Sequence, residues 1–95
     1  MTATVGFVLP PISEEHALPR YRFHLYNDEE TLDLEGRHFP DLEAAHADAI
    51  QTARSIMGSE LASKGEITLS HWIELETEEG EMHVVTFGDT VKINP

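Results

Sequence analysis

Cysteine is absent from the chain, so disulfide bonds and thiolate metal sites cannot contribute to its fold. Basic residues are scarce: 6 Lys and Arg stand against 18 Asp and Glu, a formal net charge of −12. Such a surface repels phosphate backbones and anionic membranes, so we expect no direct nucleic-acid partner and no membrane partner. The acidity suits a cationic partner, a divalent ion or a nucleic-acid mimic, and a plain solvated acidic surface is the simplest interpretation.

Long apolar runs are also missing, so the sequence predicts no transmembrane helix. The N-terminus has no basic segment, and Pro10 and Pro11 interrupt its short apolar run, which argues against a signal peptide. We therefore expect a cytoplasmic protein. A length of 95 residues suits one small domain, and we expect an N-terminal extension over residues 1–19 and a single domain over residues 20–95.

One long amphipathic helix is expected to begin after Asp41, a favoured N-cap residue. Apolar side chains then recur at three- and four-residue spacing, which predicts a stripe that faces a sheet. Gly58 weakens the last turns, Leu61 continues the stripe if the helix does not fray, and Lys64 followed by Gly65 predicts the helix end. The stripe comprises Leu42, Ala45, Ala49, Ala53, Ile56 and Met57.

Four segments predict β-strands. Residues 20–27 and 67–76 alternate apolar and polar side chains, and residues 82–87 return from the latter through a turn at Gly80. Residues 37–39 form a short strand beside the first, and the acidic residues before them form a loop. Together with the helix, these strands predict an α+β fold: a two-layer β-β-α-β-β sandwich with one long helix on a four-stranded antiparallel sheet of strand order 2-1-3-4.

Two hairpin registers are open at Gly80. A three-residue loop with a bulge pairs Ile73 with Val85, whereas a two-residue loop pairs Ile73 with Thr86. We prefer the first register because it also sets Leu75 opposite His83 and gives one coherent apolar face.

Several short motifs follow one another at a distinctive spacing: Pro19–Leu25 (PRYRFHL), Asp33–Gly36 (DLEG), Phe39–Ala45 (FPDLEAA), Ala53–Arg54, Glu74–Gly80 (ELETEEG) and Val85–Phe87 (VTF). Over residues 19–93 this arrangement resembles a family of short bacterial proteins recorded only as a domain of unknown function, found mainly in alphaproteobacteria such as rhizobia. Arg22 departs from the family pattern, where an aromatic residue is usual, and residues 1–18 precede the usual start. The resemblance implies a small α+β fold and a cytoplasmic bacterial protein, and it implies no activity or catalytic residue.

Catalytic and metal-binding patterns are missing from the sequence. It contains no Gly-x-Ser-x-Gly, Ser-x-x-Lys or Gly-rich phosphate loop, and its six histidines lack zinc-site spacing. The acidic loop over residues 28–35 lacks EF-hand spacing, although cation binding there stays an open question. We therefore expect no enzyme activity, no catalytic residue, no cofactor and no metal.

The sheet face opposite the helix is the candidate interaction surface. Aromatic residues, Arg and Met are enriched at protein interfaces, and Trp72 is expected there as an exposed anchor. The alternative is that residues 7–9 of the extension cover this face. The candidate residues are Arg22, His24, Tyr26, Trp72, Glu74 and Val84, with Ser70, Met82 and Thr86 on the same face.

These observations predict a non-enzymatic protein-interaction or accessory module. Its partner is another protein or a second copy of the chain, bound through the open sheet face or an exposed edge strand. The net charge of −12 motivates a second hypothesis, an acidic inhibitor or nucleic-acid mimic that binds a cationic partner.

Overall fold

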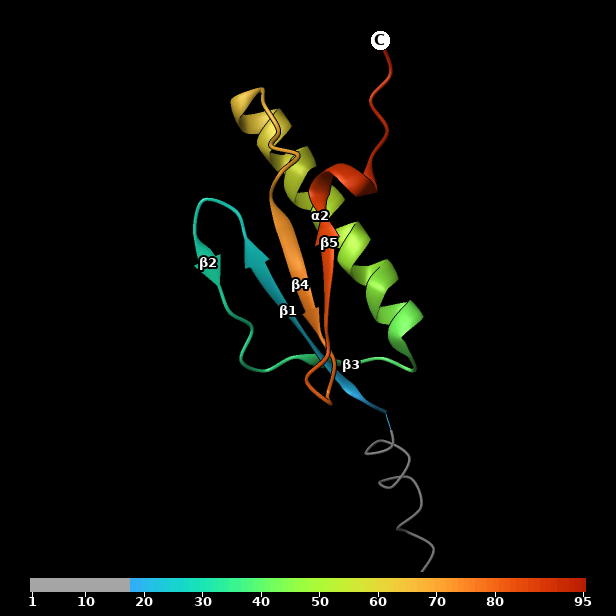
Figure 1. The fold of residues 1–95 in the computed structure, drawn as a ribbon. Coiled ribbons are helices and arrows are strands. Elements are labelled where there is room, and N and C mark those ends of the chain that lie inside the picture. Colours follow the sequence, from blue (N-terminus) through green and yellow to red (C-terminus); the bar gives the residue numbers. More distant parts are fainter. Residues whose placement is uncertain (1–17) are drawn as a thin grey trace, which may run out of the picture.

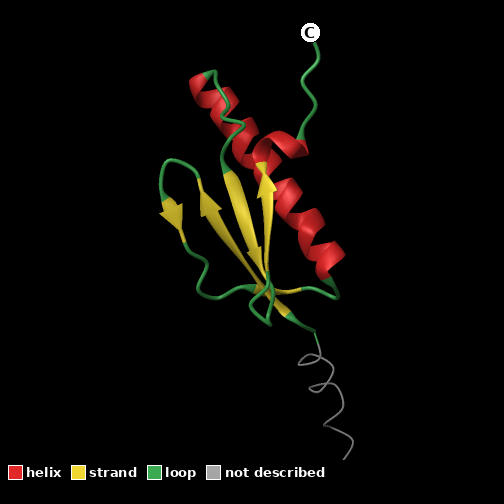
Figure 2. Cartoon of the chain, viewed as in Figure 1, coloured by secondary structure: helices red, strands yellow, loops and turns green. Residues whose placement is uncertain are grey.

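A computed structural model describes residues 18–95 of the chain, so residues 1–17 of the expected extension lie outside the described part. One helix packs on one face of an antiparallel sheet, which confirms the α+β fold class (Figures 1 and 2). The elements in chain order are β1 (Arg20–Tyr26), β2 (Glu30–Thr31), β3 (Arg37–His38), α2 (Leu42–Lys64), β4 (Trp72–Glu76), β5 (Met82–Thr86) and the 3₁₀ helix η2 (Phe87–Thr90).

The sheet has five strands in the order β2-β1-β4-β5, and β3 pairs with β1 as well. The expected order 2-1-3-4 needs correction because the outer strand is divided into β2 and β3. Between these two pieces the side chain of Asp33 accepts the Phe23 N–H over 3.1 Å, so a carboxylate takes the place of a strand backbone at that point. The expected acidic loop therefore contains a short strand that the sequence pattern did not indicate.

The strand β1 separates its side chains as the alternation predicts. Tyr21, Phe23 and Leu25 point toward α2 and pack into the core. β1 also pairs with β4 along its whole second half, with His24 opposite Glu74. β1 is therefore the central strand that positions both faces of the sheet.

The helix begins and ends as the sequence predicts. Asp41 caps it by accepting the Ala44 N–H over 2.8 Å, and Gly65 closes it at φ 73° with its N–H bonded to Leu61 O at 2.9 Å. It stays continuous through Gly58, yet Leu61 is 55% exposed, so the stripe does not extend that far. A 23-residue helix spans about 35 Å and outruns strands of about 17 Å, which leaves its last turns without a sheet beneath them. The buried stripe consists of Ala45, Ala49, Ala53 and Met57.

The predicted strand over residues 67–76 is too long. β4 begins only at Trp72, and a turn occupies Leu69 and Ser70. The partner strand ends at the same level, because η2 starts at Phe87 and the Gly88 N–H bonds back to Leu69 O over 2.9 Å. The alternating pattern before Trp72 thus has no strand to pair with.

The β4–β5 hairpin has the preferred register, with Ile73 opposite Val85. The Thr77 N–H donates to Glu81 O over 2.8 Å, and Gly80 takes φ 93° in the connecting turn. Phe87, expected as the last strand residue, instead opens η2 and is fully buried in the core.

Candidate functional site: the open face of the sheet

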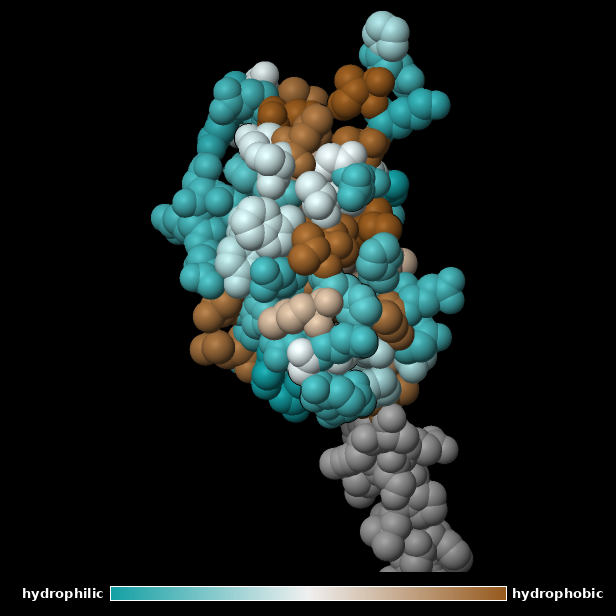
Figure 3. Space-filling model, viewed as in Figure 1, coloured by the Kyte–Doolittle hydropathy of each residue, from teal (hydrophilic) through white to brown (hydrophobic). Residues whose placement is uncertain are grey.

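The sheet face away from α2, called the open face below, carries three rows of side chains. In the view of Figure 3 the strands lie in front of α2, and brown and white side chains gather over β4 and β5 among teal ones. All six residues predicted for this surface lie on it, whereas Ser70 lies in the turn before β4. The rows are Tyr26–Trp72–Thr86, His24–Glu74–Val84 and Arg22–Glu76–Met82.

An aromatic pair forms one end of the open face. Tyr26 and Trp72 are direct partners in the β1–β4 ladder, and their rings stack with centroids 5.1 Å apart and planes 7° from parallel. The indole Nε1–H donates to Glu74 Oε2 over 3.3 Å. Trp72 is only partly exposed, because Tyr26 covers one face of its ring. The expectation of an exposed anchor is corrected accordingly. Such stacking contributes about 0.5–1.5 kcal/mol beyond area burial.

His24, a second predicted interaction residue, is buried at 7% exposure. Its Nδ1 accepts the Asp33 backbone N–H over 3.0 Å, and its Nε2 lies 2.8 Å from Glu76 Oε1. Because Nδ1 accepts a hydrogen bond, the neutral ring carries its proton on Nε2. This N–H donates a hydrogen bond to Glu76. His24 therefore fastens the loop after β2 to the sheet and is not available for contact with a partner.

The Asp33 side chain also holds the loop after β2 against the sheet. One carboxylate oxygen accepts the Phe23 N–H, and the other accepts the N–H groups of Glu35 and Gly36 at 3.1 and 2.9 Å. Burial alone raises the pKa of Asp33, but the hydrogen bonds from Gly36, Phe23 and Glu35 outweigh it, so the pKa lies below its usual range. The carboxylate is thus engaged by backbone and is not free to ligate a cation.

The remaining acids of the loop do not assemble a metal site. Asp28 lies 3.6 Å from His71, between its Oδ1 and the ring Nε2. Within residues 18–95, no group of three or more His, Asp or Glu side chains converges in a way that could hold a metal ion.

A family model described as "Domain of unknown function (DUF6894)" matches residues 20–88. This chain belongs to the DUF6894 family. The match runs from the start of β1 into η2, so it contains the open face and both edges of the sheet. Neither the comparison with curated proteins nor that with solved structures gave a match. Within the described part of this DUF6894 domain, no helix has the length and apolarity needed to cross a membrane.

The phenol of Tyr26 is held in its protonated form. Burial, a hydrogen bond to Glu30 and the nearby charge of Glu74 raise the pKa of Tyr26 to about 12. Glu30 is the residue opposite Tyr26 in the β1–β2 pair. At neutral pH the hydroxyl is therefore protonated, and the charges of Glu30 and Glu74 both favour that form.

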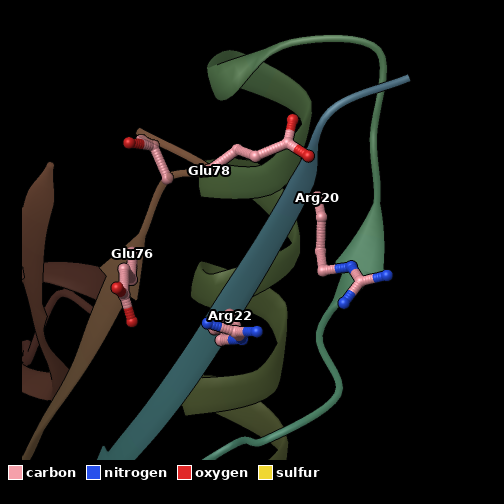
Figure 4. A pocket seen from close by; sticks show the side chains of 5 residues that line it. Arg20, Arg22, Glu76 and Glu78 are labelled. Carbon is pink, nitrogen blue, oxygen red and sulfur yellow. The ribbon is translucent and has the colours of Figure 1, made fainter. Parts of the chain in front are cut away.

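A small cleft of about 140 Å³ opens at the other end of the DUF6894 open face. Figure 4 shows Arg22 on β1 beside the strand that carries Glu76 and leads to Glu78, whereas the Arg20 side chain points to the other side of β1. Glu76 is the register partner of Arg22, but it bonds to His24, and the buried Nε of Arg22 has no hydrogen-bond partner within residues 18–95. No sequence motif marks this cleft.

The edge strand β5 supplies the apolar part of the open face. Met82 and Val84 are 50% and 60% exposed, and both lie on the same side of the strand. The sequence pattern predicts both Val84 and Met82 on this face, and the structure places them there.

Proposed function

We propose that this DUF6894 domain is a non-enzymatic protein-interaction module that binds a partner protein through the open face. The observation that carries the proposal is the Tyr26–Trp72 stack, which lies partly exposed on a sheet face that no described element covers. Trp and Tyr are the residues most enriched among those that dominate binding energy at interfaces. The exposed Met82 and Val84 extend this apolar surface toward β5.

The polar groups around the stack support binding more than catalysis. His24 and Asp33 are engaged in hydrogen bonds that fasten the loop. The Arg22 cleft is about 140 Å³, below the about 300–1,000 Å³ of typical small-molecule pockets. A flat surface with aromatic groups and a polar rim fits a macromolecular partner better than a small substrate.

The charges at the open face favour a partner that carries basic groups. Glu74 lies at the centre of the rows, Glu76 lies two residues further along β4, and Glu30 lies opposite Tyr26 on β2. The same acidity motivates the second candidate, an acidic inhibitor that binds a cationic partner. The two candidates differ in salt dependence, because binding driven by exposed charges weakens steeply as salt rises and binding driven by aromatic burial does not.

Trp72 provides the test, since it is the only tryptophan in the chain. Immobilised wild-type protein is compared with Trp72→Ala and with Gln51→Ala, an exposed control on α2. We expect a partner from native cell extract to bind wild type and the control alike and to bind Trp72→Ala at least about tenfold more weakly. Circular dichroism establishes that each variant is folded. Equal capture by folded Trp72→Ala and wild type would contradict the proposal.

Once a partner is isolated, the fluorescence of Trp72 gives a second readout. Binding over the open face buries the indole further and shifts its emission to shorter wavelength. A titration in low and in high salt then separates the two candidates.

A further inference from the structure

We infer that β5 is a homodimerisation edge: a second copy of the chain pairs its own β5 antiparallel to this one, across a two-fold axis at Val84. The inference rests on the proposed function, because self-association is one form of protein binding by this module. It goes beyond that function by naming the partner, the strand and the register.

The two edges of the sheet differ in their protection. The outer edge of β1 is covered by β2, by β3 and by the Asp33 carboxylate between them. The outer edge of β5 pairs with no other strand within residues 18–95 (Figure 1). Its sequence, Met-His-Val-Val-Thr, contains none of the devices that usually blunt a free edge, such as Pro, Lys or another permanent charge. An unprotected edge of this kind indicates a strand partner.

The hydrogen bonds of the hairpin identify which backbone groups face outward. At the two ends of the ladder, Thr77 N–H donates to Glu81 O and Phe87 N–H donates to His71 O, both over 2.8 Å. Backbone groups alternate in direction along an antiparallel strand, so the odd-numbered residues of β5 point toward β4. The even-numbered residues Met82, Val84 and Thr86 therefore point their N–H and C=O groups away from the sheet.

This arrangement is symmetric about Val84. When two copies pair with Val84 opposite Val84, Met82 of each lies opposite Thr86 of the other, and every outward group of both strands finds a partner. A slip of two residues leaves groups unpaired at both ends. The interface is isologous, which closes it as a dimer.

The formal net charge of −12 on each chain does not prevent this contact. No carboxylate lies within β5, and the central acid of the open face, Glu74, lies on β4. Three strand spacings then separate Glu74 from its copy, about 14 Å at about 4.8 Å each. That distance exceeds the Debye length of about 8 Å at physiological ionic strength, so the repulsion is largely screened.

The pairing also joins the exposed apolar side chains. Met82 and Val84, at 50% and 60% exposure, lie on the open face next to the axis. Facing β-branched pairs stabilise antiparallel sheets by about 0.2–1 kcal/mol each. The two open faces become one continuous surface with a Tyr26–Trp72 stack in each half.

Sedimentation equilibrium of the full-length chain tests the inference. We expect wild type to approach twice its 10.7 kDa monomer mass as concentration rises. Val84→Lys puts a charge on the axis, and Val84→Pro removes the outward N–H at a position where an edge strand tolerates proline. Each variant should raise the dimer dissociation constant at least about tenfold. Gln51→Lys, with the same charge change on exposed α2, should leave it unchanged.

The register of the β5–β5 pair is tested by cross-linking. The chain has no native cysteine, so an introduced cysteine is the only thiol that can react. A short bismaleimide should join Val84→Cys into dimers and leave Gln51→Cys largely monomeric. A wild-type chain that stays monomeric at millimolar concentration, or a dimer that survives both Val84 variants, overturns the inference. If the wild type is monomeric and Val84→Lys abolishes its binding to a different protein, the inference is also overturned, and the β5 edge is assigned to that protein. Failure of the proposed function is seen separately, as partner binding that Trp72→Ala leaves intact.

Discussion

The backbone N–H of Asp33 donates to Nδ1 of His24 over 3.0 Å, while the opposite ring nitrogen lies 2.8 Å from Glu76 Oε1. The imidazole thus connects the loop after β2 to β4 across the central strand. The bond is possible only with Nδ1 unprotonated, so the ring tautomer follows from the contact. The Asp33 carboxylate completes the connection by accepting three backbone N–H groups.

Replacing Asp33 should measure the strength of this connection. Asp33→Ala removes a carboxylate that accepts the N–H groups of Phe23, Glu35 and Gly36 and leaves them to solvent. Because the site is partly exposed, we expect a loss of about 2–3 kcal/mol in the free energy of unfolding, measured by urea denaturation. Glu35→Ala keeps its backbone N–H and should stay within about 0.5 kcal/mol of wild type. Equal effects of the two variants would show that the carboxylate contributes nothing.

The stabilisation by Asp33 should depend on pH. Its pKa is lowered in the folded protein, so the ionised carboxylate is favoured there over the unfolded chain. The contribution is complete above the unfolded value of about 3.9 and is lost as pH falls through the lower folded value. Unfolding free energies of wild type and Asp33→Asn should therefore differ by a constant amount from pH 7 to about pH 5 and converge in stronger acid. A difference that persists unchanged into strong acid would refute the assignment.

Gly36 and Gly65 can be compared to measure how much stability is lost when a Cβ is added at a glycine. Both have positive φ, 74° and 73°, so alanine is strained by a similar amount at each. At Gly36 a Cβ would also lie 2.7 Å from Tyr21 O, whereas at Gly65 nothing lies within 4 Å. We expect Gly65→Ala to cost about 1 kcal/mol and Gly36→Ala to cost at least about 1 kcal/mol more. Thermal or urea unfolding of the two variants side by side measures the difference, and equal losses would exclude the steric contribution.

The elements that sequence reasoning predicted well are those encoded by local patterns. Asp41 and Gly65 bound the helix through capping chemistry that depends only on nearby residues. The hairpin register follows from Gly80 and from the need to keep Ile73 and Val85 on one face. For the same reason the alternation placed all six candidate residues on the open face.

The features that were missed depend on contacts between distant parts of the chain. The Asp33 carboxylate accepts a hydrogen bond from the Phe23 backbone N–H. No periodic sequence pattern indicates that a side chain will take the position of a neighbouring strand. Alternation also assigned His24 to the correct face without indicating that it is buried there. Residues before Trp72 alternate like a strand, but their partner strand has already turned into η2.

Tyr26 offers a spectroscopic test of the carboxylates beside the aromatic stack. Burial, a hydrogen bond to Glu30 and the charge of Glu74 raise the pKa of Tyr26 to about 12, and burial foremost also raises the pKa of Tyr21. The chain has only 2 tyrosines, so absorbance at about 295 nm should show no phenol ionising near the ordinary value of about 10 while the protein stays folded. Ionisation of one phenol near pH 10 in the folded protein would contradict this expectation.

The source of the Tyr26 shift can be isolated in a Tyr21→Phe background, where Tyr26 alone absorbs. Glu30→Gln removes a negative charge opposite Tyr26 in the β1–β2 pair and should move the titration toward lower pH. Glu29→Gln, one residue earlier and exposed, should leave it in place. Because the folded pKa is raised, the neutral phenol stabilises the fold below the unfolded value of about 10, and this contribution is lost as pH rises toward about 12. If Glu30→Gln titrates like its parent, Glu30 does not raise the pKa of Tyr26, and burial with the charge of Glu74 accounts for the shift.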